Sequence, residues 1–106
     1  MNIVFVEPGF PNNQRRFVLA LAAVGANVIG LGESEEWALD GEIRDAMTGY
    51  YKVGNVTNVR EMTDAVRFIQ SKLWVDRLEA TVEAHTMAAA QVREARKDLA
   101  RIEKQL

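Results

Sequence analysis

The segment from Glu7 to Gln14 holds the side chains best suited to binding a ligand. Gly9 would let a ligand approach the backbone closely, and Asn12, Asn13 and Gln14 offer amide donors where a helix is expected to begin. These groups make the segment a candidate substrate-binding site. The alternative is structural, with the prolines and the glycine shaping a turn and the asparagines capping the helix.

A second segment, Thr81 to His85, carries Glu83, which could fix a substrate amine or orient a neighbouring lobe. His85 is the single histidine of a chain without cysteine, so a role at the helix surface or in packing explains it better than metal binding or general-base work. We therefore assign no catalytic residue and no metal ligand. The candidate substrate-binding residues are Glu7, Pro8, Gly9, Phe10, Asn12, Asn13, Gln14 and Glu83.

The elements that position these residues alternate along the chain. The apolar, β-branched run 2–6 predicts a strand buried on both faces, and the following helix is expected to turn Phe17, Leu21 and Val24 inward and to stop at Gly25. Further strands are predicted at 27–31, 50–53 and 73–78. Three further helical segments are predicted. The first, after Ser34, is short or broken; the second begins after Asn58 and buries Met62, Val66 and Ile69; the third is one long helix over 81–106.

This alternation predicts an α/β fold, a Rossmann-like three-layer parallel sheet of about four strands with a long carboxyl-terminal helix. In the strand order 3-2-1-4 the ligand crevice lies at the carboxyl ends of strands one and four. The segments 7–14 and 81–85 follow those two strands, so we expect them to converge on one site.

The stretch from Ile3 to Gln14, followed by Phe17, Leu21, Gly25 and residues 28–30, resembles the start of the pre-ATP-grasp domain of ATP-grasp ligases. The stretch 75–85 is similar to the segment that joins this domain to the ATP-binding part in carboxylase-like and carbamoyl-phosphate-synthetase-like members. Together these matches cover most of residues 1–95, which the resemblance implies to be a pre-ATP-grasp-like domain. The resemblance implies a sheet that helps to bind the carboxylate or other acceptor substrate, while a later module holds ATP and magnesium.

After Ala95 the family turns toward a Gly/Pro-containing loop and the ATP-grasp fold, whereas this chain continues with charged and aliphatic residues to Leu106. The resemblance therefore implies the substrate-side domain of an ATP-dependent ligase without its ATP-binding lobes. Such a fragment is not catalytic by itself, contains no cofactor, and has the remainder of an ATP-grasp enzyme as partner. Neither the G-x-G-x-x-G pattern of nicotinamide-binding folds nor a P-loop is present.

A different hypothesis is a non-catalytic self-association module. Val92, Leu99, Ile102 and Leu106 fall on one stripe of the predicted long helix. A helix over 81–106 would measure about 39 Å, which exceeds the diameter of a small domain, so its carboxyl end is expected to protrude. Two chains are then expected to form a homodimer through this helix. The alternative is that the same stripe packs on the sheet of its own chain.

Composition narrows the remaining function classes. The chain has 106 residues and a formal net charge of −2 with both signs interspersed, so no basic surface is expected to collect nucleic acid. No apolar run approaches the roughly 20 residues of a membrane helix, and no signal segment is evident. The absence of cysteine fits a reducing compartment, and the expected location is cytoplasmic.

Overall fold

The computed structural model describes residues 1–9, 14–80 and 89–94. Its centre is a sheet of four parallel strands, β1 (Asn2–Val6), β2 (Asn27–Gly32), β3 (Gly49–Lys52) and β4 (Arg77–Glu79), in the order β3-β2-β1-β4. The predicted Rossmann-like α/β class and the predicted strand order are both confirmed.

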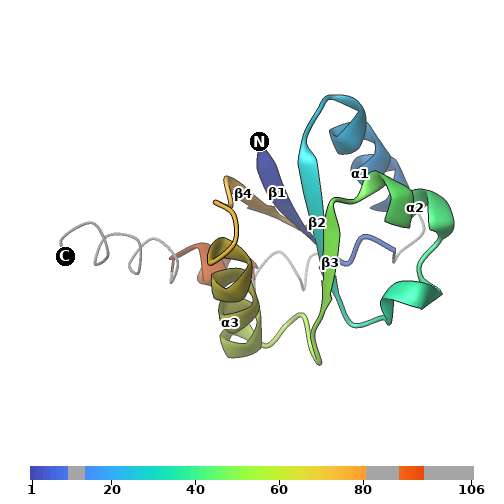
Figure 1. The fold of residues 1–106 in the computed structure, drawn as a ribbon. Helices are drawn as coiled ribbons and strands as arrows, with labels where there is room; N and C mark the ends of the chain where they lie inside the picture. The colour runs from blue at the N-terminus through green and yellow to red at the C-terminus, as the bar shows by residue number, and fades with distance from the viewer. Residues whose placement is uncertain (10–13, 81–88, 95–106) are drawn as a thin grey trace.

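Helices cover the two faces of this sheet (Figure 1). On one side lie α1 (Gln14–Ala23) and α2 (Gly41–Ala46), and on the other lies α3 (Val59–Gln70). The segment after Ser34 is broken, as predicted, into a short 3-10 helix, η1 (Glu36–Ala38), and α2. Residues 89–94 are also helical.

Strand β4 is shorter than predicted because the residues before it form a connection. The carboxylate of Asp76 accepts the backbone N–H of Asn2 at 2.7 Å, where a continuing strand would have used a backbone carbonyl. Val75 in this connection is nevertheless fully buried. In the segment 73–78 only Val75 and Leu78 are buried, and strand pairing is confined to its end, Arg77–Glu79.

The larger hydrophobic core lies between the sheet and α3, where Val4 and Val6 of β1 meet the predicted stripe of Met62, Val66 and Ile69. Val92 belongs to the same core and is 0% exposed. Val92 is therefore not an interface residue of this chain, because it packs against its own sheet and α3. The other predicted interface residues, Leu99, Ile102 and Leu106, lie outside the described residues.

The smaller core lies between the sheet and α1, and here the predicted inward stripe is wrong in part. Val18 is fully buried against the sheet, whereas Phe17 is 47% exposed and Val24 is 82% exposed. Leu21 lies at the margin of this core, half-buried. The stripe of Phe17, Leu21 and Val24 therefore does not point straight at the sheet. Helix α1 ends before Gly25, whose φ of 90° supports the predicted stop.

Candidate functional site

Glu7 ties the ends of β1 and β2 together at the carboxyl edge of the sheet. Its backbone N–H donates to the carbonyl of Leu31 at 2.8 Å, and its carboxylate accepts the N–H of Glu33 at 2.6 Å. The residue is only 7% exposed and adopts a left-handed backbone with φ of 56°. Such a conformation is costly for a residue with a side chain, so the surrounding contacts must hold it in place.

Gly32 makes room for this arrangement. A Cβ atom at this position would lie 2.9 Å from Oε1 of Glu7 and 2.8 Å from the hydroxyl oxygen of Tyr50. Both distances are shorter than carbon–oxygen contact allows, so a larger residue would displace one of the two polar groups. The end of β2 is therefore shaped around Glu7 and Tyr50.

Tyr50 is a partly buried residue beside several carboxylates. Its hydroxyl donates to the carbonyl of Ser34 at 2.6 Å. Burial raises the pKa of Tyr50 to about 12, and the negative charges of Glu7, Glu35 and Glu36 add to the shift. The phenol therefore stays neutral at physiological pH and acts as a hydrogen-bond donor rather than as a base.

A pocket of about 640 Å³ opens beside this edge, between the loop after β1 and the connection from β2 to α2. Its described lining combines polar and apolar groups: Gly9, Arg15, Ser34, Ala38, Leu39, Asp40 and Ile43. A Cβ atom on Gly9 would lie 2.8 Å from Cδ2 of Leu39, so only glycine leaves this wall of the pocket unobstructed.

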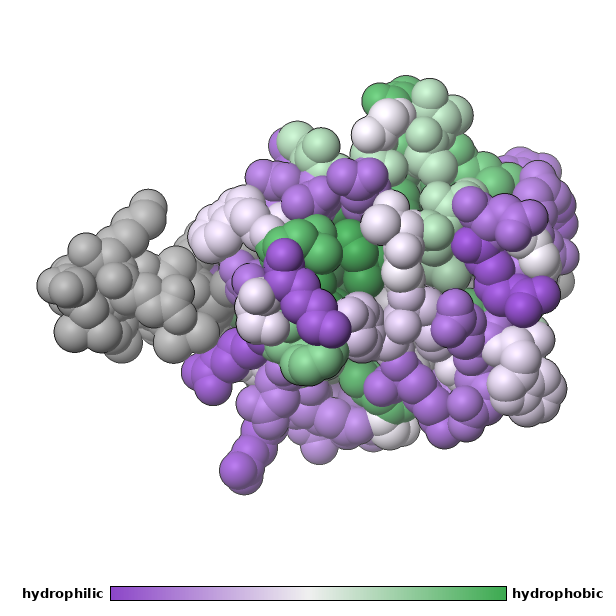
Figure 2. Space-filling view, viewed as in Figure 1, coloured by the Kyte–Doolittle hydropathy of each residue, from purple (hydrophilic) through white to green (hydrophobic). Residues whose placement is uncertain are grey.

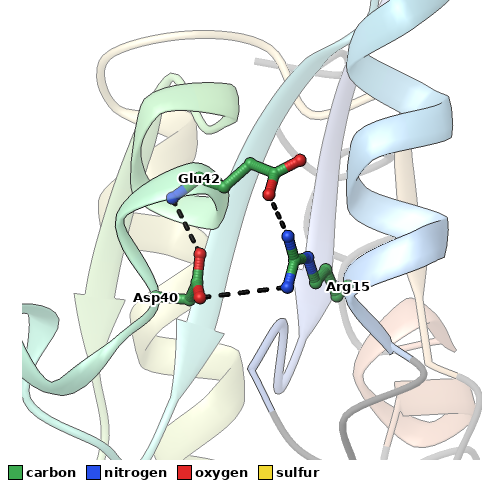
Figure 3. Close-up of polar contacts among 3 residues, drawn as sticks. All are labelled: Arg15, Asp40 and Glu42. Atoms are coloured by element: carbon green, nitrogen blue, oxygen red, sulfur yellow. Dashed lines mark hydrogen bonds and ion pairs between the residues drawn. The ribbon is translucent and has the colours of Figure 1, made fainter.

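Arg15 supplies the positive charge of the pocket (Figure 3). Its guanidinium forms an ion pair with Glu42, and its Nη1 lies 3.9 Å from the carboxylate of Asp40. Asp40 also caps α2 by accepting the N–H of Glu42 at 2.8 Å. A guanidinium between two carboxylates can bind an anionic group of a ligand, while Asp40 can receive a cationic one.

The structure brings three predicted site residues, Glu7, Pro8 and Gly9, together at the carboxyl edge. Pro8 is buried over β2, since a Cβ atom on Gly30 would lie 2.9 Å from its Cγ. Gln14 begins α1 but is only 1% exposed, so it packs inside rather than lining the described pocket. The remaining candidates, Phe10, Asn12, Asn13 and Glu83, lie outside the described residues, as does the segment 81–85.

Sequence reasoning missed Asp40 and did not include Arg15 among the candidate site residues. Asp40 stands directly before Gly41 and Glu42, a pattern typical of a helix cap, and this signal could have placed it at the start of a helix. No sequence signal pairs it with Arg15, because the two residues are brought together by the packing of α1 beside α2.

Among residues 1–9, 14–80 and 89–94, no group of three histidine, cysteine or acidic side chains is arranged to hold a metal ion. No helix in this described part of the chain is long and apolar enough to cross a membrane. Comparison with known protein families and with curated proteins finds no match for this chain.

Proposed function

We propose that this chain is the amino-terminal, substrate-side domain of an ATP-grasp ligase of the carbamoyl-phosphate-synthetase-like or biotin-carboxylase-like kind. The observation that carries the proposal is the position of the loop after β1. This loop leaves the carboxyl end of β1 beside the point where the strand order reverses between β1 and β4, which is where open α/β sheets take their ligands. The residues of this loop are also those that resemble the family.

In this proposal the domain forms one wall of the acceptor-substrate site. Gly9 gives the acceptor access to the wall, and Arg15 offers its guanidinium to a carboxylate. A bound carboxylate has to compete with Glu42 for that guanidinium, so affinity in the domain alone is expected to be weak. ATP and magnesium are bound by a separate part of the enzyme, and the chain alone neither hydrolyses nucleotide nor ligates.

The test is a titration of the nitrogen-15-labelled chain followed by NMR. A small carboxylate, an amino acid or bicarbonate is expected to shift the amide signals of Gly9, Arg15 and Ser34. Magnesium-ATP is expected to shift none of them. Arg15→Gln is the test variant, because it removes the guanidinium charge and leaves a shorter, uncharged polar side chain in its place.

Two results would contradict the proposal. One is binding of ATP by the isolated chain with a dissociation constant in the micromolar range. The other is a set of carboxylate-induced shifts that lie away from this pocket and persist in Arg15→Gln.

A further inference from the structure

A second concave surface lies on the α1 side of the sheet, between α1 and β4. It encloses about 680 Å³ and is lined by apolar residues of β1 and α1 together with two charged residues of β4. The apolar part is formed by Met1, Ile3, Phe5, Phe17, Leu21, Val24 and Ala26, and the charged part by Arg77 and Glu79. We call this surface the α1–β4 groove.

The α1–β4 groove leaves large hydrophobic side chains in water. Met1 is 62% exposed, Phe17 47% and Val24 82%. Phe17 lies in α1 and Val24 directly after its end, and because the N–H of Val24 still donates to the carbonyl of Ala20, the two side chains lie two turns apart on one face. No element among residues 1–9, 14–80 and 89–94 covers this face, and exposed apolar surface of this kind is typical of a protein–protein contact.

Strand register fixes where the two charges stand along the groove. Glu79 pairs with Phe5, whose ring stacks on Phe17 at 6.5 Å between centroids, so Glu79 is level with the start of α1. Arg77 pairs with Ile3 and therefore stands nearer the end of α1. A helix lying in the groove parallel to α1 would meet Glu79 with its amino-terminal part and Arg77 with its carboxyl-terminal part. This arrangement suits a helix dipole in that direction.

The helix α1 itself has the features that such an occupant needs. Its first turn contains Arg15 and Arg16 and no acidic residue, and its last turn contains no basic residue. Its exposed stripe of Phe17 and Val24 is apolar. We propose that α1 of a second copy of this chain occupies the α1–β4 groove, in a two-fold dimer in which the two α1 helices run parallel and side by side.

The two-fold symmetry makes the contact self-complementary, because each copy provides both a groove and the helix that fills the other groove. Exposed Arg16 of one copy faces Glu79 of the second copy. Within its own chain Glu79 lies 4.0 Å from the guanidinium of Arg93, a pair whose side chains are 37% and 43% exposed, which leaves this carboxylate open to a second cation. The dimer contact is separate from the ligand pocket and does not rest on the ligase proposal.

The first test is sedimentation of the full chain at concentrations from about one micromolar to several hundred micromolar, where a monomer–dimer equilibrium is expected. Val24→Glu is expected to weaken the association by about a hundredfold, because each dimer buries two of these side chains. Trp37→Glu is the matched control, since Trp37 is 76% exposed in η1, away from the groove, and is expected to leave the association unchanged. Circular dichroism verifies that both variants fold.

The second test exchanges charges between copies. Arg16→Glu and Glu79→Lys are each expected to weaken self-association by about tenfold, because each places like charges at two symmetric contacts. An equimolar mixture of the two variants is expected to restore association, since both contacts of the mixed dimer then join opposite charges. A role of either residue in the stability of its own chain would not produce this recovery.

A wild-type chain that stays monomeric over the whole range overturns the proposal. So does a dimer that survives Val24→Glu, or a mixture of the charge variants that associates no better than either alone. A dimer that Leu99→Glu with Ile102→Glu dissociates, and that Val24→Glu leaves intact, would assign self-association to the carboxyl-terminal segment instead.

Discussion

The left-handed backbone of Glu7 leads to an unusual prediction, namely that glycine at this position is more stabilising than alanine. Both substitutions remove the carboxylate that accepts the N–H of Glu33 at 2.6 Å. Loss of a hydrogen bond to a charged group costs about 1.5–3 kcal/mol. The two variants differ in the backbone, because φ is 56° and only glycine adopts that region without strain.

The expected magnitudes follow from these two contributions. Glu7→Ala loses the hydrogen bond and keeps the strain, so its free energy of unfolding should fall by about 2 kcal/mol. Glu7→Gly loses the same bond but is relieved of roughly 1–2 kcal/mol of left-handed strain, partly offset by the larger backbone entropy of an unfolded glycine. We therefore expect Glu7→Gly to be more stable than Glu7→Ala by about 1 kcal/mol, the reverse of the usual order.

Urea denaturation followed by far-ultraviolet circular dichroism measures both free energies of unfolding, provided that the dependence on urea concentration is alike in the two variants. Glu7→Gln is a useful third variant, because its amide oxygen can still accept from Glu33 without a charge. The reasoning fails if Glu7→Ala is as stable as the wild type, which would mean that the hydrogen bond contributes nothing. It also fails if alanine is more stabilising than glycine, which would mean that the backbone at this position is not strained.

Three further predictions concern the same edge of the sheet and α3. The pKa of Tyr50 is raised from 10.0 to about 12 in the folded chain, so its contribution to the free energy of unfolding is complete below pH 10 and is lost as pH rises through 12. Tyr50→Phe should therefore flatten the dependence of the free energy of unfolding on pH over this interval. Gly9→Ala should change stability by less than about 1 kcal/mol, since the obstructing Cδ2 of Leu39 ends a flexible side chain, whereas Gly9→Val should narrow the pocket and abolish the carboxylate-induced NMR shifts. Asn58→Ala should lower the unfolding free energy by about 1 kcal/mol, because its side chain accepts the N–H of Glu61 at the start of α3; Asn58→Asp, which keeps the acceptor, should be nearly neutral in the same urea titration.

Most of the fold could be predicted because local patterns and packing agree. Strand β1 is apolar on both faces and is indeed covered on both sides by helices, with Val4 facing α3 and Phe5 facing α1. The stripe of Met62, Val66 and Ile69 on α3 could likewise be predicted, because all three side chains are buried in the larger core. Asn58 and Glu61 have the spacing of a reciprocal capping box, but only half of it forms, because the carboxylate of Glu61 accepts the N–H of Gly54 instead.

The candidate site was less predictable because it depends on contacts between distant segments. The importance of the loop after β1 could be predicted from its position in the strand order. The left-handed backbone of Glu7 could not, because a non-glycine residue with positive φ is held by its surroundings rather than by its own preference. The pairing of Arg15 with Asp40 and Glu42 requires α1 to lie beside α2, which neither helix encodes alone.

The error in α1 and the proposed dimer have one physical origin, the chemical character of β4. Periodicity shows that Phe17, Leu21 and Val24 share a face, but it does not show which surface that face meets. Strand β4 presents Arg77 and Glu79 to the α1 side of the sheet and so provides no apolar floor there for α1 to cover. The helix consequently packs through Val18 over the inner strands, and its apolar stripe is left beside the charged edge. A symmetric contact requires an apolar stripe that the sheet of the same chain does not cover. In the proposed dimer the stripe of α1 forms a wall of the groove in its own copy and also fills the groove of the other copy.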